Sequence, residues 1–351
     1  MKEPIIAVGI TSGKEITFTM TGLYRQPGND GLVSGSNRVT MSESGLSMEW
    51  NGRKYTTLTF DPTSFDGDSF QLEGVTIGVE FDWERKENQA FRGSLRFVVN
   101  DGLIIAINDV PTEEYLKSVI SSEMKATSSL SLLRAHAVIS RSWLFAQIFR
   151  DRESRPGVER GFRDEKEIVK WWDHDDHTLF DVCADDHCQR YQGISKIVDG
   201  KAVGAVEDTR GEVLKYDGAL CDTRFSKCCG GVFERFESCW EQSPHPYLAP
   251  RRDGVNENDF LDLTEEIAAA KWIESEPTAF CNTADRRILS QVLNEYDIES
   301  TDFYRWTETY TQEEIQELLR TRSDINVGKV LSLTPLERGS SGRIVRLKIT
   351  G

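Results

Sequence analysis

No stretch of the 351-residue chain approaches the ~20 consecutive apolar residues that a membrane-spanning helix needs. The first apolar run, from Ile5 to Ile10, is interrupted by Gly9 and is too short for the core of a signal peptide. The sequence therefore predicts no membrane span and shows no visible signal peptide. Export would need a signal that was removed or lies outside this sequence.

Positive charge is also scarce. The chain has 42 Lys and Arg against 58 Asp and Glu, a formal net charge of −16, and no evident basic run. A nucleic-acid-binding protein needs a basic face to neutralise phosphates, so this balance argues against a nucleic-acid partner. A neutral or weakly charged polymer such as a glycan fits the composition better.

Cysteine is too sparse for a disulfide scaffold, because the chain has only seven and the number is odd. The seven are unevenly placed. Cys183 and Cys188 lie among histidines, four fall between Cys221 and Cys239, and Cys281 stands alone. This clustering favours a metal site at least as much as disulfides.

The pattern of apolar residues predicts an α+β fold. Short apolar-rich runs separated by turn residues predict strands over residues 4–108. From Thr112 to Glu123, apolar residues recur at helical spacing, and residues 130–149 are apolar on nearly all sides, which predicts a buried helix. Residues 190–235 return to strand-like runs.

Near the end of the chain, Thr311 and Glu314 form a capping box that predicts a helix, and residues 343–351 alternate as a strand does. We expect three segments: a β-rich region at 1–108, a mixed α/β core at 109–260 with an insertion at 173–193, and a helical and strand extension at 261–351. A strand that stops at the last residue predicts a chain truncated at its C-terminus.

Glu123 is the first candidate functional residue. It follows Val119 by four positions and Ile120 by three, so it falls on the apolar face of the predicted helix. Removal from water raises the pKa of a carboxyl group, which a general acid needs near neutral pH. In the alternative, the helix ends before Glu123 and the carboxylate is solvated, as most glutamates are.

Arg141 lies in the middle of the second predicted helix. It needs an acceptor there, because a buried charge is rarely left unpaired. The acceptor could be a core carboxylate, a loop carbonyl or a substrate. A structural ion pair and a role in support of catalysis therefore both stay open.

Two histidines and two cysteines, His177, Cys183, His187 and Cys188, fall within twelve residues. Two imidazoles and two thiolates make a closed tetrahedral shell, which is typical of structural zinc. The alternative is a Cys183–Cys188 disulfide with surface histidines, and His174 is a substitute ligand.

The remaining clustered cysteines, Cys221, Cys228, Cys229 and Cys239, have no histidine at ligand spacing. For these we expect buried free thiols or a single Cys229–Cys239 bridge.

Several further segments occur in a recognisable order. Residues 108–119 read NDVPTEEYLKSV, Ser122-Glu123-Met124 follows, and residues 133–142 carry Arg141. Later come Tyr-Gln-Gly at 191–193, AVEDTRGEVL at 205–214, FSKCCGG at 225–231, Trp240 and Tyr247. Together they resemble the SpoIID/LytB family of bacterial stage II sporulation and autolysin-modifier proteins. His136 stands where the family usually has Gln.

The resemblance implies a lytic transglycosylase that cleaves peptide-stripped glycan strands of peptidoglycan. In this enzyme Glu123 would be the single general acid and base, Arg141 would support it, and the product would carry a 1,6-anhydro end. The resemblance also implies zinc at the His–Cys cluster, since some relatives carry a similar one. Tyr191, Trp240 and Tyr247 could stack on sugars or belong to the core.

Two other functions stay open. The resemblance also allows a non-catalytic peptidoglycan-binding protein that recruits or activates a cell-wall amidase. A zinc hydrolase fits less well, because four protein ligands would fill the metal. By resemblance we expect an extracytoplasmic location, in the periplasm or cell envelope, and family members usually continue past the position of Gly351.

Overall fold

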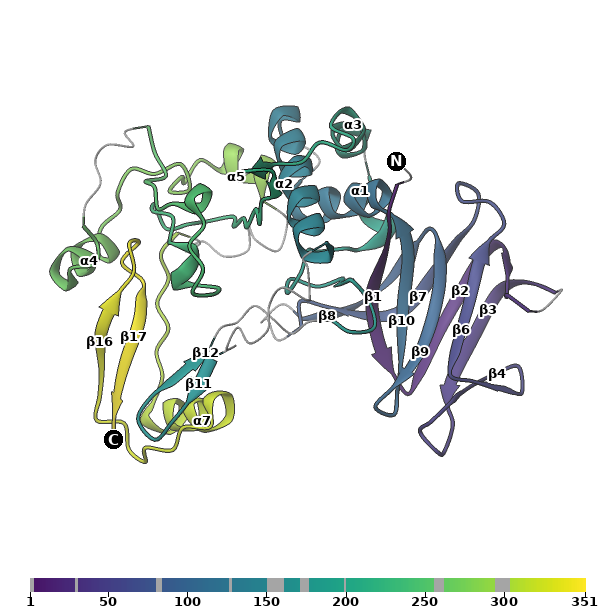
Figure 1. The fold of residues 1–351 in the computed structure, drawn as a ribbon, viewed down its shortest axis with the longest axis horizontal. Coiled ribbons are helices and arrows are strands. Elements are labelled where there is room, and N and C mark those ends of the chain that lie inside the picture. The colour runs from purple at the N-terminus through teal and green to yellow at the C-terminus, as the bar shows by residue number, and fades with distance from the viewer. Residues whose placement is uncertain are drawn as a thin grey trace. The chain divides into compact units, whose positions relative to one another are not determined.

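A computed structural model describes residues 3–28, 31–79, 84–125, 128–149, 161–170, 177–198, 200–255, 262–293 and 304–351. It is a mixed α+β structure with a large N-terminal sheet, as the sequence predicted (Figure 1). The chain divides into two compact units. The first unit is residues 1–150 with 176–223, and the second is residues 151–175 with 224–351.

An 11-stranded sheet forms most of the first unit among the described residues. Its main path runs β13-β1-β10-β9-β6-β2-β3-β4-β5, and β7 pairs with β2 and β8. Its apolar side chains alternate into a core in which the rings of Phe18, Phe60 and Phe97 lie 5.1–6.4 Å apart. The strands are β1 (Ile5–Gly13), β2 (Glu15–Arg25), β3 (Leu32–Met41), β4 (Met48–Trp50), β5 (Arg53–Tyr55), β6 (Thr57–Pro62), β7 (Ser69–Ile77), β8 (Arg85–Phe91), β9 (Ser94–Asn100), β10 (Leu103–Pro111) and β13 (Val182–Cys183).

Strand β1 joins the N-terminal region to the later part of the unit. It pairs antiparallel with β10 and, at Val8 and Gly9, parallel with β13. A Cβ atom on Gly9 would lie 2.6 Å from the Phe180 ring, so only glycine permits this close approach. Because the sheet spans both regions, the compact units differ from the three segments expected at 1–108, 109–260 and 261–351.

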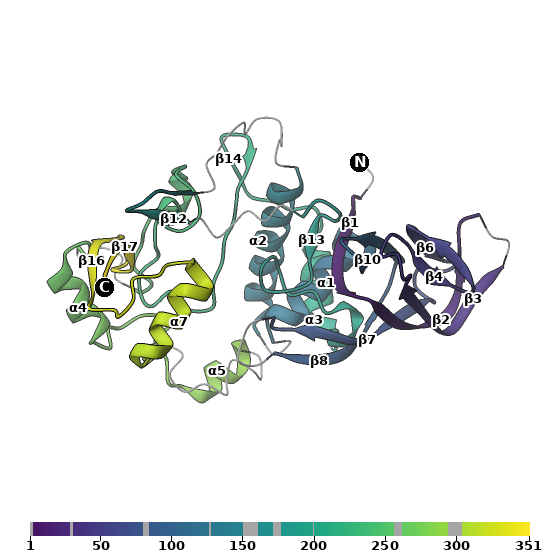
Figure 2. The ribbon, with the colours of Figure 1, turned by 90° about the horizontal axis from the view of Figure 1, so that it is seen from below.

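Among its described residues the first unit has three helices: α1 (Thr112–Glu123), α2 (Leu130–Ile148) and α3 (Gly200–Asp208). Helix α1 has the predicted bounds and follows β10 directly. Helix α2 is capped by Ser129, whose side chain accepts the Leu132 N–H. Both helices are as predicted. Helices α1 and α3 lie at the β1–β10 end of the sheet, away from β3 and β4 (Figures 1 and 2).

The expectation of strands throughout 190–235 was wrong at α3. Ala202, Ala205 and Val206 lie at helical spacing and are the buried residues of this helix. A short helical element, η2 (Gly193–Lys196), precedes α3, and the hairpin β14 (Lys215–Tyr216) and β15 (Ala219–Leu220) follows it.

The second unit contains two hairpins, three helices and two short 3-10 turns among its described residues. Val232, Leu263 and Trp272 form a small core. The capping box of Thr311 and Glu314 opens a helix, as predicted. The elements are β11 (Gly161–Arg163), β12 (Ile168–Lys170), η3 (Phe236–Ser238), η4 (Pro246–Leu248), α4 (Glu266–Ile273), α5 (Arg286–Val292), α7 (Gln312–Ser323), β16 (Ser332–Arg338) and β17 (Ile344–Thr350).

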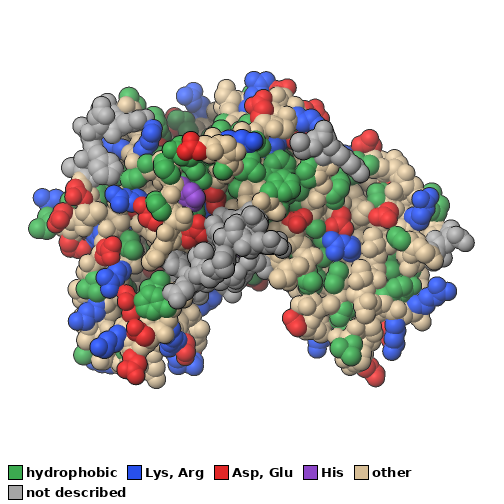
Figure 3. Space-filling view, in the orientation of Figure 1, with side chains coloured by type: hydrophobic (Ala, Val, Ile, Leu, Met, Phe, Trp, Pro, Cys, Tyr) green, Lys and Arg blue, Asp and Glu red, His purple; other side chains and the backbone are tan. Residues whose placement is uncertain are grey.

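The surface carries mixed charge. On the face shown in Figure 3, Lys and Arg side chains are scattered among Asp and Glu. Within the described ranges, no helix has both the length and the apolar character needed to cross a bilayer.

Candidate active site and metal centre

Glu123 is the last residue of α1 and only 7% of it is exposed. One carboxylate oxygen, Oε1, accepts the backbone N–H of Arg190 at 3.0 Å. The helix therefore includes Glu123 and turns it toward the interior, and the alternative of a solvated loop residue is not what the structure contains. A buried carboxylate that is held by a backbone donor has a fixed position from which it can transfer a proton.

The segment that carries Arg190 is attached to α1 by further side chains. The Ser118 hydroxyl accepts the Gln192 N–H at 3.2 Å, and the Tyr115 hydroxyl donates to the Gln189 side chain at 3.2 Å. Three side chains of α1, those of Tyr115, Ser118 and Glu123, thus contact residues 189–192. The sequence analysis missed Tyr115 and Ser118, because the partner of each lies 74 residues away along the chain.

A groove of about 450 Å³ opens in the first unit beside this segment. Arg190 lines the groove, while its backbone N–H holds Glu123 and its Nε donates to Asp186 at 2.7 Å. Gln89 also lines the groove. It is 1% exposed, and neither atom of its side-chain amide has a hydrogen-bond partner among the described residues. A buried amide of this kind is suited to a polar ligand.

Tyr191 lies in the core of the first unit. It is 2% exposed, and its hydroxyl donates to Asn108 Oδ1 at 2.6 Å. The ring stacks on Tyr115 with centroids 5.1 Å apart and contacts Phe91 at 5.8 Å. Burial raises the pKa of its hydroxyl far above the usual value, with the charge of Glu114 adding to the effect. The sequence analysis left two alternatives for Tyr191, stacking on a sugar or a place in the core, and these contacts agree with a place in the core.

Trp240 and Tyr247 belong to the second unit, whereas Glu123 belongs to the first. The Arg224 guanidinium lies 4.5 Å from the centre of the Trp240 ring, in cation–π geometry. The Tyr247 hydroxyl lies 3.3 Å from His245 Nδ1. Both aromatic side chains are half-buried.

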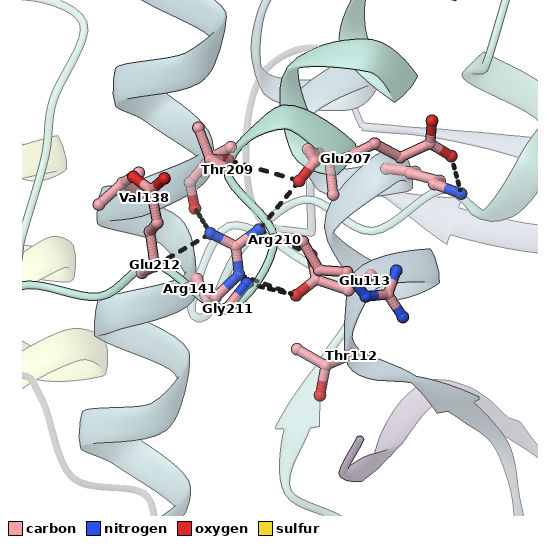
Figure 4. A network of polar contacts seen from close by, with 12 residues as sticks. Thr112, Glu113, Val138, Arg141, Glu207, Thr209, Arg210, Gly211 and Glu212 are labelled. Atoms are coloured by element: carbon pink, nitrogen blue, oxygen red, sulfur yellow. Dashed lines mark hydrogen bonds and ion pairs between the residues drawn. The ribbon is translucent and has the colours of Figure 1, made fainter. Parts of the chain in front are cut away.

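Arg141 is completely buried, and its guanidinium pairs with Glu113 (Figure 4). Nη2 and Nε donate to the two Glu113 oxygens at 2.6 and 3.1 Å, and Nη1 donates to the Glu212 carbonyl at 3.1 Å. The acceptors are thus a core carboxylate and a loop carbonyl. Glu113 precedes Glu123 by ten residues, roughly 15 Å along the axis of α1. Arg141 therefore acts at the opposite end of the helix from Glu123.

The four predicted metal ligands come together. One ligand atom from each of His177, Cys183, His187 and Cys188 lies within 4.8 Å of all the others. Cys188 Sγ is 3.4 Å from His177 Nε2 and 3.4 Å from His187 Nδ1, and Cys183 Sγ is 3.9 Å from His187 Nδ1. A zinc tetrahedron of sulfur and nitrogen has edges of about 3.3–3.8 Å. The donor set and its spacing fit that metal.

Neither thiol of this cluster forms a disulfide, so the alternative of a Cys183–Cys188 disulfide is not formed in the structure. The Cys188 thiol, and then His177 and His187, lower the pKa of Cys183 far below its usual value against the opposing effect of burial. The thiolate is the form that binds metal. His174 lies outside the described residues.

Of the two alternatives expected for the remaining cysteines, the structure contains free thiols and not the Cys229–Cys239 bridge. Both thiols are free, and Cys229 Sγ lies 3.6 Å from the sulfur of Cys281. Cys281 follows Cys229 by 52 residues, a distance along the chain at which spacing gives no signal.

Two family models match different parts of the chain. Residues 100–216 match the family described as Stage II sporulation protein (SpoIID), and residues 234–351 match a domain of unknown function (DUF8618). The first match contains Glu123, Arg141 and the His–Cys cluster. The second contains Trp240 and Tyr247.

Three relatives match the chain in part. An uncharacterized protein of Brachyspira hyodysenteriae is 27% identical over 158 residues, 45% of the chain and 36% of the relative. The amidase enhancer of Bacillus subtilis is 31% identical over 138 residues, 39% of the chain and 15% of the relative. Stage II sporulation protein D of Bacillus amyloliquefaciens is 23% identical over 152 residues, 41% of the chain and 38% of the relative. The matched stretches thus span less than two thirds of each relative.

Proposed function

Because the chain belongs to the SpoIID/LytB family through its domain at residues 100–216, we propose that it is a lytic transglycosylase acting on peptidoglycan glycan strands. The observation that carries the proposal is the Glu123 carboxylate, buried at the end of α1 and held by the Arg190 N–H. The substrate we propose is a strand stripped of its peptides, outside the cytoplasm.

The proposed reaction needs one carboxyl group. Glu123 protonates the glycosidic oxygen as the bond from that oxygen to C1 breaks. The resulting carboxylate takes the proton of the C6 hydroxyl in the same sugar, and O6 bonds to C1. The product has a 1,6-anhydro end, no water is consumed, and Glu123 is again protonated. Most glycoside hydrolases instead need a second carboxylate flanking the bond.

The groove beside Arg190 is the surface on which we expect the glycan to bind. Its polar side chains include the buried amide of Gln89, which can exchange hydrogen bonds with sugar hydroxyls. Arg190 connects the groove with Glu123, because it lines the groove and its backbone N–H donates to the Glu123 carboxylate.

The His–Cys cluster would hold a structural zinc with four protein ligands: His177, Cys183, His187 and Cys188. A closed shell leaves no position for a reactive water. The proposed work of the metal is to fix the segment of residues 177–192, which supplies the Arg190 N–H to Glu123.

Glu123→Gln tests the proposal. The amide cannot cycle a proton, so release of anhydro-ended fragments, measured by mass spectrometry, should fall by roughly 10²–10⁴-fold while the protein stays folded. Glu114→Gln on the same helix is the matched control, because Glu114 pairs with Lys117 and lies away from Glu123. Wild-type turnover by the Glu123 variant would exclude this residue as the acid.

A non-catalytic role is the second candidate, since one relative is named an amidase enhancer. In that role the chain would bind glycan and stimulate a cell-wall amidase. The discriminating measurement is amidase activity in the presence of wild type or Glu123→Gln. Equal stimulation by the two proteins, with no glycan fragments released by the wild type, would favour this candidate.

A further inference from the structure

A second group of thiols comes together in the second unit. The ligand atoms of Cys229, Asp253 and Cys281 lie within 4.8 Å of one another. The Cys229 and Cys281 sulfurs are 3.6 Å apart. Three separate segments of the chain therefore present two sulfurs and a carboxylate to one point, and Cys228 directly precedes Cys229 in the chain.

Backbone hydrogen bonds hold these three segments together. The Asp253 N–H donates to the Gly231 carbonyl at 3.0 Å, and the Phe280 N–H donates to the Asp253 carbonyl at 3.0 Å. The Cys281 N–H donates to the Asp253 side chain at 3.0 Å. The geometry of the cluster is thus built into the fold of this unit and does not depend on side-chain rotamers alone.

The turn that follows the paired cysteines is specific. Gly230 and Gly231 have φ angles of 68° and 94°, and a Cβ atom on Gly231 would lie 2.7 Å from the Tyr304 hydroxyl oxygen. Glycine adopts such angles without strain, so the chain can turn sharply directly after Cys228 and Cys229.

We propose that Cys229, Asp253 and Cys281 form a second zinc site, with Cys228 as its fourth ligand. Soft thiolates select zinc over calcium or magnesium, and two sulfurs bound to one zinc lie about 3.8 Å apart. The 3.6 Å between the Cys229 and Cys281 sulfurs is close to that separation and far beyond a disulfide bond of about 2.05 Å. The metal ties the Cys-Cys-Gly-Gly turn to the segments at Asp253 and Cys281.

Zinc content of the full chain, prepared under reducing conditions, tests the site. A Cys183→Ser/Cys188→Ser variant, which lacks the first cluster, should still bind one zinc per chain. Adding Cys281→Ser should remove it, whereas adding Cys239→Ser, a cysteine outside both clusters, should not. With cobalt in place of zinc, the near-ultraviolet thiolate-to-metal band should weaken on Cys228→Ser.

Asp253→Asn provides a second measurement that keeps the sulfurs. Its zinc affinity, measured by competition with a chelator, should fall by more than the roughly 10- to 100-fold typical of losing an outer-shell partner. A native Cys229–Cys281 disulfide, or zinc content unchanged by Cys281→Ser, would overturn the proposal. These experiments measure zinc binding in variants that lack the first cluster. Their outcome therefore does not depend on the proposed enzymatic function.

Discussion

At the scale of single residues, the pair of Arg141 and Glu113 illustrates how a buried charge is accommodated. The sequence predicted that Arg141 needs an acceptor, and the structure supplies the Glu113 carboxylate and the Glu212 carbonyl. Glu113 also accepts the Gly211 N–H at 3.2 Å, so the pair joins α1, α2 and the turn after α3. Periodicity predicted the burial, but the partner depends on contacts between elements that local patterns do not encode.

Arg141→Met should lower the free energy of unfolding by about 3–5 kcal/mol, because Glu113 would remain buried without its partner. Urea unfolding measures the change. Arg134→Met on the same helix is the control. Its pair with Asp208 is exposed, so the expected loss is at most about 1 kcal/mol.

The double variant Arg141→Met/Glu113→Leu tests whether the pair contributes to activity by positioning α1 or through the guanidinium itself. It removes both charges and should regain most of the lost stability. If Arg141 acts by positioning α1, turnover per folded molecule should return with it. A stable double variant without activity would instead give the guanidinium a direct role.

At the scale of elements, helices with long periodic patterns were predictable and short elements were not. Helix α1 has the predicted bounds because its apolar stripe is continuous and Pro111 marks its start. Helix α3 was mistaken for strands, since its buried face consists mainly of small alanines. Strand β13 has two residues and exists through its pairing with β1, which no local pattern reveals.

In the candidate site, too, some contacts were predictable from the sequence and others were not. The four residues of the His–Cys cluster lie within twelve positions of the chain, so their proximity was predictable from the sequence. The contact of Arg190 with Glu123 and that of Cys229 with Cys281 join positions 67 and 52 residues apart. Only the fold determines contacts at such separations.

Cys183→Ser should release the proposed zinc and lower the melting temperature, because metal binding and folding are coupled. Amide hydrogen exchange should accelerate in residues 177–192 and change less in α2. Cys239→Ser, outside the cluster, should keep its zinc and its exchange pattern. A metal-free wild-type protein with an intact Cys183–Cys188 disulfide would contradict this prediction.

At the scale of the whole molecule, the two family matches follow the two compact units. The SpoIID match at 100–216 falls within the first unit, and the DUF8618 match at 234–351 falls within the second. The first unit completes its sheet with strands that precede the SpoIID match. One unit thus contains Glu123, and each unit contains a cluster of thiols.

Chelation should reduce activity only as far as it reduces folded protein, because a closed zinc shell cannot generate hydroxide. The measurement follows glycan release and the folded fraction together as chelator is added. Cobalt substitution should leave the 1,6-anhydro product unchanged. Loss of activity while the fold persists, or products with ordinary reducing ends, would point to a catalytic metal and away from Glu123.

The pairing of β13 with β1 has a consequence for solubility. The segment at β13 satisfies backbone groups of β1, since the Asp181 N–H donates to the Ala7 carbonyl and the Ala184 N–H to that of Gly9, each at 2.9 Å. Without this cover, an apolar strand would present an open edge, the kind of template on which chains aggregate by strand addition. A zinc that holds the segment in place would therefore protect newly made chains from associating with one another.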